Sequence, residues 1–497
     1  MKKMYWKDAL VFLLLTVSLS VIVGCQEGSK PVSAVSDAPP GADANTENPV
    51  VASMGAVNIG KQQAVAYLQS LDEPIVSNAL GQDGGLEELV KGVALRTNVI
   101  TRAAGQNWQD RPEVKAAIET AQRTVLYSMY VNEKSQPPAD YPDAAAVAQV
   151  YEANQQQLAA AGKPGLKPLK EIAPIIKQRL REQQRQTNEQ AYLNGLVSSN
   201  PITVDLNKLI TYINLPQDQK QQQEERLKEP VARMGNMAVS MGLVMKSLRS
   251  LEAPQQQQVL SSNQQLQQYV NRLAIQYFVL NEAIAAKFNA RPAVNNHMEQ
   301  ARLQVLYKTY MQAWSAPEAD FPDATLVQEN YQKNLDKLVV PDRYRLAKIV
   351  IANSGDAEID AVKVRNLASA ARVSGADFAT LARQYSQEPE SAKNGGDVGW
   401  LNTAALLPEL RQMVTASQPG AVIGPLQFQQ GWQLIKILEH QPGRQQTLEE
   451  ARPALVNALR TRRQAEKQKE ILEQLLASEP VTIDKNVLQQ LRKQISG

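Results

Sequence analysis

The residue types that most often carry out covalent or metal chemistry are scarce in this chain of 497 residues. It has two histidines, His297 and His440, and one cysteine, Cys25. Neither histidine has other His, Cys, Asp or Glu residues at the spacing of a metal-ligand set. The chain also lacks a nucleophile elbow, a phosphate-binding loop and a dinucleotide fingerprint. We therefore expect no metal and no cofactor, and any reaction that the chain promotes must proceed without them.

One stretch, from about Val340 to His440, has the pattern of a compact domain of strands and helices. Residues 343–352 alternate with the period of two that predicts a strand. Asp377 is placed as the N-cap of a short amphipathic helix. After Gly- and Pro-containing turns, Trp432–Leu438 predicts a closing strand.

The order of these elements carries a family resemblance. A strand, helices, the segment YSQEPESAKNGGDVGW (385–400), a Pro-Gly turn, a Gly-Pro pair and the segment GWQLIKILE (431–439) follow one another. This order resembles the parvulin family of peptidyl-prolyl cis-trans isomerases, most closely the domains embedded in bacterial envelope foldases of the SurA and PrsA kind. The resemblance implies an α+β domain at residues 340–445 that isomerises X-Pro bonds in unfolded or proline-containing envelope polypeptides.

The resemblance also assigns site positions. The family has a histidine in its first strand, a Cys or Asp before the Gly-Gly-Asp turn and a second histidine in its closing strand. The matching positions here hold Lys348, Glu388 and Gln433, so the catalytic positions are substituted. The positions that match the apolar lining of the family's proline pocket, or lie beside it, hold Leu401, Leu406, Leu410 and Phe428. Trp400 and Trp432 stand where the family carries structural aromatic residues, so we expect both in the core.

These substitutions need not abolish activity. Rotation of a peptide bond has a barrier of roughly 18 to 20 kcal/mol but breaks no bond. A catalyst therefore needs only an apolar surface for proline and surroundings that favour the twisted amide. A lysine on the pocket side of the first strand would disturb a dry site unless Glu388 pairs with it.

Two functional interpretations stay open. One is a foldase with parvulin-type isomerase activity. The other is a non-catalytic chaperone or assembly factor whose parvulin-like domain only binds peptide. Lipid-anchored proteins of the latter kind, the EpsD type, occur in loci for exopolysaccharide export.

The N-terminal residues predict export and lipid anchoring. Residues 1–24 place three lysines before the apolar run Ala9–Val23, which is the pattern of a signal peptide. The tetrapeptide IVGC that ends at Cys25 resembles the bacterial lipobox, which implies a lipid on Cys25. Gln26 then implies the outer membrane, so we expect the chain in the periplasm, anchored in the inner leaflet of that membrane. Residues 25–52, rich in small and polar types, predict a disordered tether.

The remaining chain is duplicated. Five motifs recur after the same number of residues, a separation that we call the shorter offset. The pairs are Met54-Gly55 with Met234-Gly235, Ser70-Leu71 with Ser250-Leu251, Arg111-Pro112 with Arg291-Pro292, Val125-Leu-Tyr127 with Val305-Leu-Tyr307, and Ala139-Asp140 with Ala319-Asp320. Two later motifs, around Pro174 and Pro201-Ile-Thr-Val-Asp205, recur at a longer offset, around Pro453 and Pro480-Val-Thr-Ile-Asp484. The second copy therefore holds an additional segment between the two sets of motifs, and this segment corresponds to the parvulin-like domain.

Outside the insert, each copy has the apolar periodicity of amphipathic helices. The last helix of the second copy begins with a capping box, Thr447-Leu-Glu-Glu450. Such helices resemble the chaperone segments of SurA-type foldases. We therefore predict a mainly α fold, a duplicated SurA-like helical chaperone module with an inserted α+β parvulin-like domain. The first module is placed at 53–215 and the second at 216–339 and 446–497.

Charge excludes one further class of function. The formal net charge is +3 at pH 7, and the basic residues are scattered, so no strong positive field would attract nucleic acid. The expected partners are polypeptides, together with a membrane through the lipid on Cys25.

Overall fold

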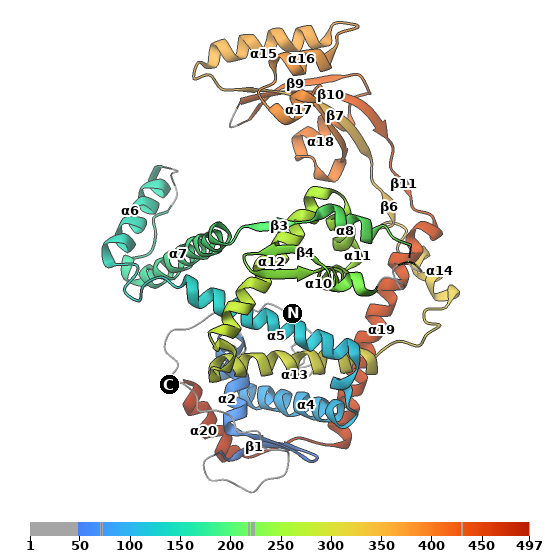
Figure 1. Cartoon of the computed structure of the whole chain (residues 1–497). Helices are drawn as coiled ribbons and strands as arrows, with labels where there is room; N and C mark the ends of the chain where they lie inside the picture. The colour runs from blue at the N-terminus through green and yellow to red at the C-terminus, as the bar shows by residue number, and fades with distance from the viewer. Residues whose placement is uncertain are drawn as a thin grey trace. The chain divides into compact units, whose positions relative to one another are not determined.

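The computed structural model describes residues 48–69, 71, 73–160, 162, 164–216, 219, 224–428 and 431–496. The predictions for residues 1–24, for Cys25 and for most of the tether at 25–52 lie outside this part. The chain divides into two units (Figure 1): a helical unit, up to Ala316 and from Gln468 onward, and a sheet unit, Pro317–Lys467. The mainly α fold with an α+β domain in the second copy is confirmed.

The first copy begins with a β-hairpin, whose first strand starts at Val50 within the stretch predicted as tether, and continues as helices. Helix α5 starts with Pro112. Proline is tolerated there because the N–H group at the first position of a helix makes no hydrogen bond within the helix. The elements are β1 (Val50–Met54), β2 (Val57–Gly60), α2 (Lys61–Gln69), α3 (Glu73–Gly81), α4 (Gly85–Gly105), η1 (Trp108–Asp110), α5 (Pro112–Ser135), α6 (Ala144–Ala160), α7 (Leu169–Ser199), β3 (Ile202–Val204) and α8 (Leu206–Ile213).

The second copy repeats these elements in the helical unit. Asn107 and Lys287, at equivalent turns, both take left-handed backbone angles, with φ of 51° and 52°. The elements are η2 (Glu224–Lys228), β4 (Pro230–Met234), β5 (Met237–Ser240), α10 (Met241–Arg249), α11 (Ala253–Leu260), α12 (Asn263–Ala285), η3 (Phe288–Ala290), α13 (Pro292–Trp314), the end of α19 (Leu448–Ser478), β12 (Thr482–Ile483) and α20 (Lys485–Ser496).

Strand pairing in the helical unit crosses between the copies that we placed in separate modules. One sheet has the order β12-β1-β2 and another the order β3-β4-β5. The last strand of the second copy therefore pairs with the first strand of the first copy, and the last strand of the first copy pairs with the first strand of the second. In Figure 1, β1 near the blue end of the chain lies beside the red helix α20.

The cores of the helical unit also mix the copies. Helices α5 and α13 run side by side (Figure 1). One apolar cluster combines residues of β1, β2 and α4 with Leu306, Tyr310 and Met311 of α13 and with Leu472 and Leu475 of α19. Burial of these side chains holds the two copies together, because each fully buried large apolar residue contributes roughly 1.5–3 kcal/mol.

The sheet unit is built on four antiparallel strands in the order β8-β7-β10-β9. Its elements are α14 (Ala324–Lys333), β6 (Val339–Val340), β7 (Arg343–Ala352), α15 (Ala357–Arg372), α16 (Phe378–Tyr385), α17 (Pro389–Lys393), β8 (Asp397–Asn402), η4 (Thr403–Ala405), α18 (Pro408–Thr415), β9 (Val422–Phe428), β10 (Gly431–Gln441), β11 (Arg444–Gln445) and the first part of α19.

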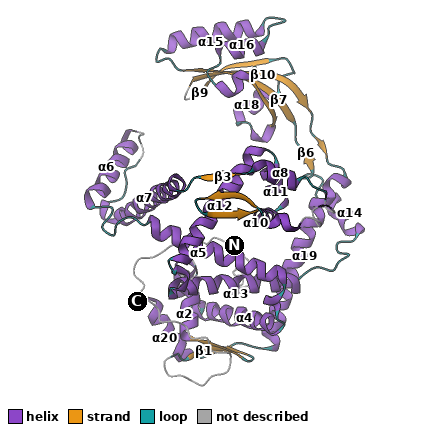
Figure 2. Ribbon diagram, viewed as in Figure 1, coloured by secondary structure: helices purple, strands orange, loops and turns teal. Residues whose placement is uncertain are grey.

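The alternation of β7 divides this sheet into two faces. Ala347, Ile349 and Ile351 pack with α15 and α16 on one face, whereas Tyr344 and Leu346 pack with α18 on the other. Figure 2 shows α15 and α16 on the opposite side of the sheet from α18. The sequence therefore supplies two apolar layers from one strand, because successive side chains point to opposite faces.

Several local predictions for this unit are confirmed. The predicted strand 343–352 is β7, and the closing strand forms as β10, somewhat longer than expected. Asp377 caps α16 by accepting hydrogen bonds from the N–H groups of Ala379 and Thr380. At the start of α19, the N–H of Glu450 donates to the Thr447 hydroxyl and the N–H of Thr447 donates to the Glu450 carboxylate. Each of these features depends on residues that are close in sequence, so the sequence alone could predict it.

The two tryptophans of the domain were both expected in the core, but they differ in burial. Trp432 is half-buried against the cluster beneath α15 and α16. Trp400 is 39% exposed, and the Arg343 guanidinium lies 5.3 Å from the centre of its indole ring. The expectation for Trp400 is wrong, and the residue lies on β8, an edge strand of the sheet.

Candidate functional site

The candidate site lies on the α18 face of the sheet. Leu346 of β7 and Ile435 and Ile437 of β10 are buried there together with Leu406 and Val414. Leu401 and Leu410 pack half-buried against the same cluster. The structure thus brings together the three leucines that the resemblance assigned to the proline pocket, and Leu406, only 6% exposed, is buried in this cluster.

Phe428, the fourth residue assigned to the pocket, lies on β9 two residues after Leu426, which packs against this cluster. It ends β9, pairs with Gly431 and is not among the residues of the apolar cluster. Its role in the pocket therefore stays a prediction without a contact to support it.

Lys348 and Glu388 meet at the edge of this apolar face. The Lys348 ammonium donates to Oε1 of Glu388 at 2.6 Å, and the Ser391 hydroxyl donates to Oε2 of the same carboxylate at 2.5 Å. The Lys348 and Glu388 side chains are 27% and 38% exposed. The charge that would have disturbed a dry site is therefore paired, as the chemistry of the face requires.

The partners of Glu388 change its ionisation. Burial of the carboxylate alone would raise its pKa, but hydrogen bonds from Lys348 and Ser391 outweigh burial and hold the pKa of Glu388 below its ordinary value. Glu388 is therefore a carboxylate at neutral pH, an acceptor and not a general acid.

Backbone hydrogen bonds along β7 hold this pair in place. The N–H of Gln387 donates to the carbonyl of Val350 at 2.7 Å, and the N–H of Lys348 donates to the carbonyl of Gly396 at 2.8 Å. The Ser386 hydroxyl accepts from the N–H of Val350. The loop that carries Glu388 is thus tied to the strand that carries Lys348.

Gly396 of the Gly-Gly-Asp turn allows this close approach. Its φ is +85°, and a Cβ atom built on it would lie 2.6 Å from the carbonyl oxygen of Lys348. Only glycine adopts such backbone angles readily and leaves that space empty. The turn therefore matters to the site through its backbone.

Gln433 lies on the same face as the apolar cluster, two residues before Ile435 on β10. In the strand register it is opposite Val350, whereas Ile435 is opposite Lys348. The three residues that the resemblance assigned to catalytic positions thus lie on β7, in the adjoining loop and on the neighbouring strand β10. Of these residues, the structure shows a side-chain contact only between Lys348 and Glu388.

Sequence reasoning missed a second charged group, centred on Arg345. Its guanidinium donates to Oδ2 of Asp397 at 2.6 Å and to Oε1 of Glu439 at 2.7 Å. Burial would raise the pKa of Asp397, but hydrogen bonds from Arg345 and from the N–H of Gly399 lower it. The Asp of the Gly-Gly-Asp turn therefore has a structural partner on the face opposite Lys348. The partners of Arg345 lie 52 and 94 residues along the chain, and no local pattern indicates them.

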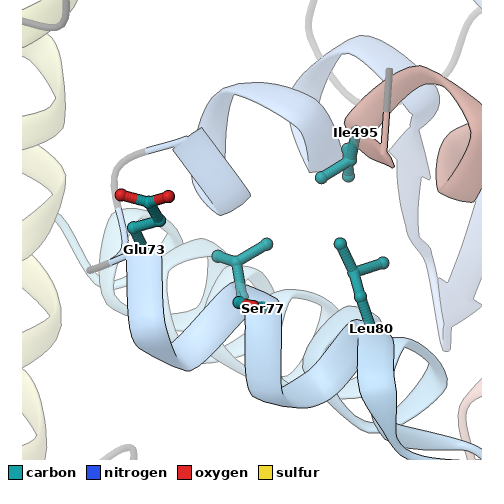
Figure 3. A pocket seen from close by; sticks show the side chains of 5 residues that line it. Glu73, Ser77, Leu80 and Ile495 are labelled. Carbon is teal, nitrogen blue, oxygen red and sulfur yellow. The ribbon is translucent and has the colours of Figure 1, made fainter. Parts of the chain in front are cut away.

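One pocket lies outside the candidate site. An open pocket of about 340 Å³ lies between α3 and α20 of the helical unit, lined by Val76, Leu80 and Ile495, with Glu73 and Ser77 beside them (Figure 3). Among the described residues, no group of His, Cys, Asp and Glu could hold a metal ion. No helix within the described ranges has the length and hydropathy of a membrane span.

What the site offers chemically is an apolar surface bordered by a paired ammonium and carboxylate. Neither member of the pair is placed as a free nucleophile or proton donor. An arrangement of this kind can bind an apolar ring and surround a twisting amide, which suits a reaction without covalent intermediates.

Comparison with known proteins gives this region its family. Residues 351–439 match the rotamase family, described as a PPIC-type PPIase domain. The match includes Glu388, Gln433 and the four pocket positions, and Lys348 lies three residues before it.

Relatives with this similarity include chaperones. Chaperone SurA of Pseudomonas fluorescens is 45% identical over 64 residues, which are 13% of this chain and 15% of the relative. Chaperone SurA of Pseudomonas syringae is 38% identical over 104 residues, which are 20% and 23% of the two chains. The chain thus spans less than a quarter of the length of these relatives.

Among solved structures, a SurA-like chaperone of Campylobacter jejuni is 19% identical, with coverage of 52% of this chain and 100% of that one and a TM-score of 0.30. That score is too low to establish a shared overall arrangement. The resemblance drawn from the sequence around the Gly-Gly-Asp turn is confirmed by the family match and the SurA relatives. The chain therefore carries a PPIC-type parvulin domain and is similar over part of its length to SurA chaperones.

Proposed function

We propose that this chain is a lipid-anchored periplasmic foldase whose parvulin domain isomerises X-Pro bonds in envelope or exported polypeptides. The observation that carries the proposal is the leucine-lined face bordered by the Lys348–Glu388 pair. Because the ammonium is paired, the face keeps the dry character that amide rotation needs, although the family's histidines are replaced.

Each residue has an expected role in this reaction. Leu401, Leu406 and Leu410 would contact the proline ring, and Glu388 would modulate the adjoining amide. An amide twisted out of conjugation has less charge separation than a planar one, so apolar surroundings favour the twisted form. Catalysis here requires no group to accept or release a proton.

A protease-coupled isomerisation assay on the full chain tests the proposal. We expect acceleration with peptides that carry several residues before proline, and a loss of at least about tenfold in kcat/KM for Leu410→Ala. Leu407→Ala is the matched control, because Leu407 lies on the same segment but is 61% exposed. No acceleration by a folded chain, or equal losses in both variants, would contradict the assigned site.

The alternative is a chaperone or assembly factor, such as one for exopolysaccharide export of the EpsD type, whose parvulin domain only binds peptide. The observation that favours it is the identity of the three substituted positions, Lys348, Glu388 and Gln433. This alternative predicts suppression of client aggregation without isomerase activity. Equal suppression by a chain that lacks residues 341–440 would show that the domain is not the peptide-binding element.

The anchoring at Cys25 has its own test. Labelled palmitate should be incorporated into the wild-type chain in bacterial cells and not into Cys25→Ser, which should also leave the membrane fraction. Membrane association of the unlabelled variant would contradict a lipid anchor.

A further inference from the structure

Each of the two sheets of the helical unit pairs a strand of one copy with a strand of the other, and the two pairings are equivalent. Ala52 of β1 pairs with Ile483 of β12, and Ala232 of β4 pairs with Val204 of β3. Ala52 and Ala232 are equivalent at the shorter offset of the duplication, and Val204 and Ile483 are equivalent at the longer one. The same register is therefore used twice, each time with one strand from each copy.

The helix contacts follow the same rule. Trp108 of the first copy meets Tyr310 of the second edge to face, with ring centroids 5.3 Å apart and planes at 84°. Phe288 and Tyr130 form the equivalent pair at 5.2 Å and 76°. At the shorter offset, Phe288 is the counterpart of Trp108 and Tyr310 is the counterpart of Tyr130. One contact thus occurs twice, with the roles of the copies exchanged.

The ends of the long helices contact both copies. Leu472 and Leu475 of α19 pack in the cluster that combines β1, β2 and α4 of the first copy with α13 of the second. Their counterparts at the longer offset, Leu193 and Leu196 of α7, pack against the cluster that combines α12 of the second copy with α5 of the first. Each copy thus gives its C-terminal segment to the other.

Reciprocal use of the same surfaces by two similar subunits defines the isologous interface of a two-fold dimer. Two independent tandem modules would instead pair β1 with β3 and β4 with β12. We propose that the two copies bind each other as the two subunits of a dimer do. Their association does not require the covalent connection between Pro216 and Glu224. This inference is independent of isomerase or chaperone activity.

Burial supports an interface of this kind. Leu306, Tyr310 and Met311 of the second copy are at most 6% exposed where they meet the first copy. Leu126, Tyr130 and Val131 of the first copy are at most 5% exposed where they meet the second. Obligate dimer interfaces have this core-like character, and separated copies would expose both sets to water.

The test cuts the connection and measures whether the halves stay together. A protease site is inserted between Pro216 and Glu224 of the full chain, and the folded protein is cleaved. We expect both halves to elute as a 1:1 complex at micromolar concentration and to appear as such by native mass spectrometry. If unlabelled cleaved protein is mixed with isotope-labelled cleaved protein, the halves should exchange. Hybrid complexes with one labelled and one unlabelled half should therefore appear over time.

Two variants from the exchanged contacts complete the test. Trp108→Ala and Phe288→Ala should each raise the dissociation constant of the cleaved complex by at least about tenfold. Val414→Ala, buried in the sheet unit, is the control and should leave it unchanged. Separation or precipitation of the halves on cleavage, while the uncleaved insertion variant remains folded, would overturn the proposal. Unchanged dissociation constants in both aromatic variants would overturn it as well.

Discussion

The Lys348–Glu388 pair joins two opposite charges at the edge of an apolar face in the domain that matches the rotamase family. Both side chains are about a third exposed, so solvent screens their attraction, and exposed pairs contribute only about 0–1 kcal/mol. The pair matters to the site mainly because it neutralises the charge of Lys348. A lysine without its carboxylate would leave a partly buried charge beside the leucines.

A double-mutant cycle measures this coupling. We expect Lys348→Met and Glu388→Gln each to lower the free energy of unfolding, and the double variant to lose less than the sum. The coupling should be about 1 kcal/mol and should shrink in high salt, as measured by urea denaturation. Strictly additive effects would show that the pair contributes nothing as a unit.

The pH dependence follows from the lowered pKa of Glu388. Its folded-state pKa lies below the ordinary value of 4.5, so the pair stabilises the fold fully above about pH 4.5. That contribution is lost as pH falls through the lower folded-state pKa. We expect Glu388→Gln to lose less stability than wild type between neutral and strongly acid pH. Thermal unfolding across that range checks this, and parallel curves for the two proteins would contradict it.

At this scale the sequence could assign positions but not partners. Lys348 and Glu388 were placed by family resemblance, and their contact depended on a loop conformation that residue types do not specify. Arg345 was missed because Asp397 and Glu439 reach it only after three strands have aligned. Phe428 matched by position in the chain but lies outside the leucine cluster.

At the scale of elements, the Gly-Gly-Asp turn allows a direct comparison of two glycines. Gly396→Ala should cost about 3 kcal/mol, because the new Cβ meets both an unfavourable φ and the Lys348 carbonyl. Gly399→Ala, with φ of +77° and no atom within 4 Å of the new Cβ, should cost only about 1 to 2 kcal/mol.

Chemical denaturation of both variants gives these costs. An equal loss in the two would mean that the backbone angle alone matters. Isomerase activity, where present, should fall further in Gly396→Ala, because that turn holds the strand that carries Lys348.

Elements were predicted well where their signals are local. The alternation of β7, the Asp377 cap and the capping box at Thr447 each involve residues a few positions apart. The choice of strand partners could not be predicted in this way. The segments around β3 and β12 read PITVD and PVTID, so their residue types do not distinguish which of them pairs with β1 and which with β4. A period of two specifies a strand but not its neighbour.

At the scale of the whole molecule, two units with separate cores should unfold in two steps. Leu491 is fully buried in the helical unit and Val414 in the sheet unit. Leu491→Ala should lower the stability of the first unit by about 2–5 kcal/mol, and Val414→Ala should lower that of the second by about 2 kcal/mol.

Differential scanning calorimetry separates these effects. Each variant should move one transition and leave the other in place. A single transition that shifts with both variants would show that the units unfold as one cooperative body.

The pairing of β1 with β12 has a consequence for the newly made chain. Ser53 and Thr482, whose hydroxyl groups are 2.6 Å apart, are separated by 429 positions. The sheet β3-β4-β5 can form while the chain is still being synthesised, because its strands are close in sequence. The sheet β12-β1-β2 can form only after β12, which begins at Thr482, has been synthesised. Contacts of such long range form slowly, so β1 and β2 need protection from aggregation in the meantime. A protein proposed to assist the folding of others would itself be such a client during its own synthesis.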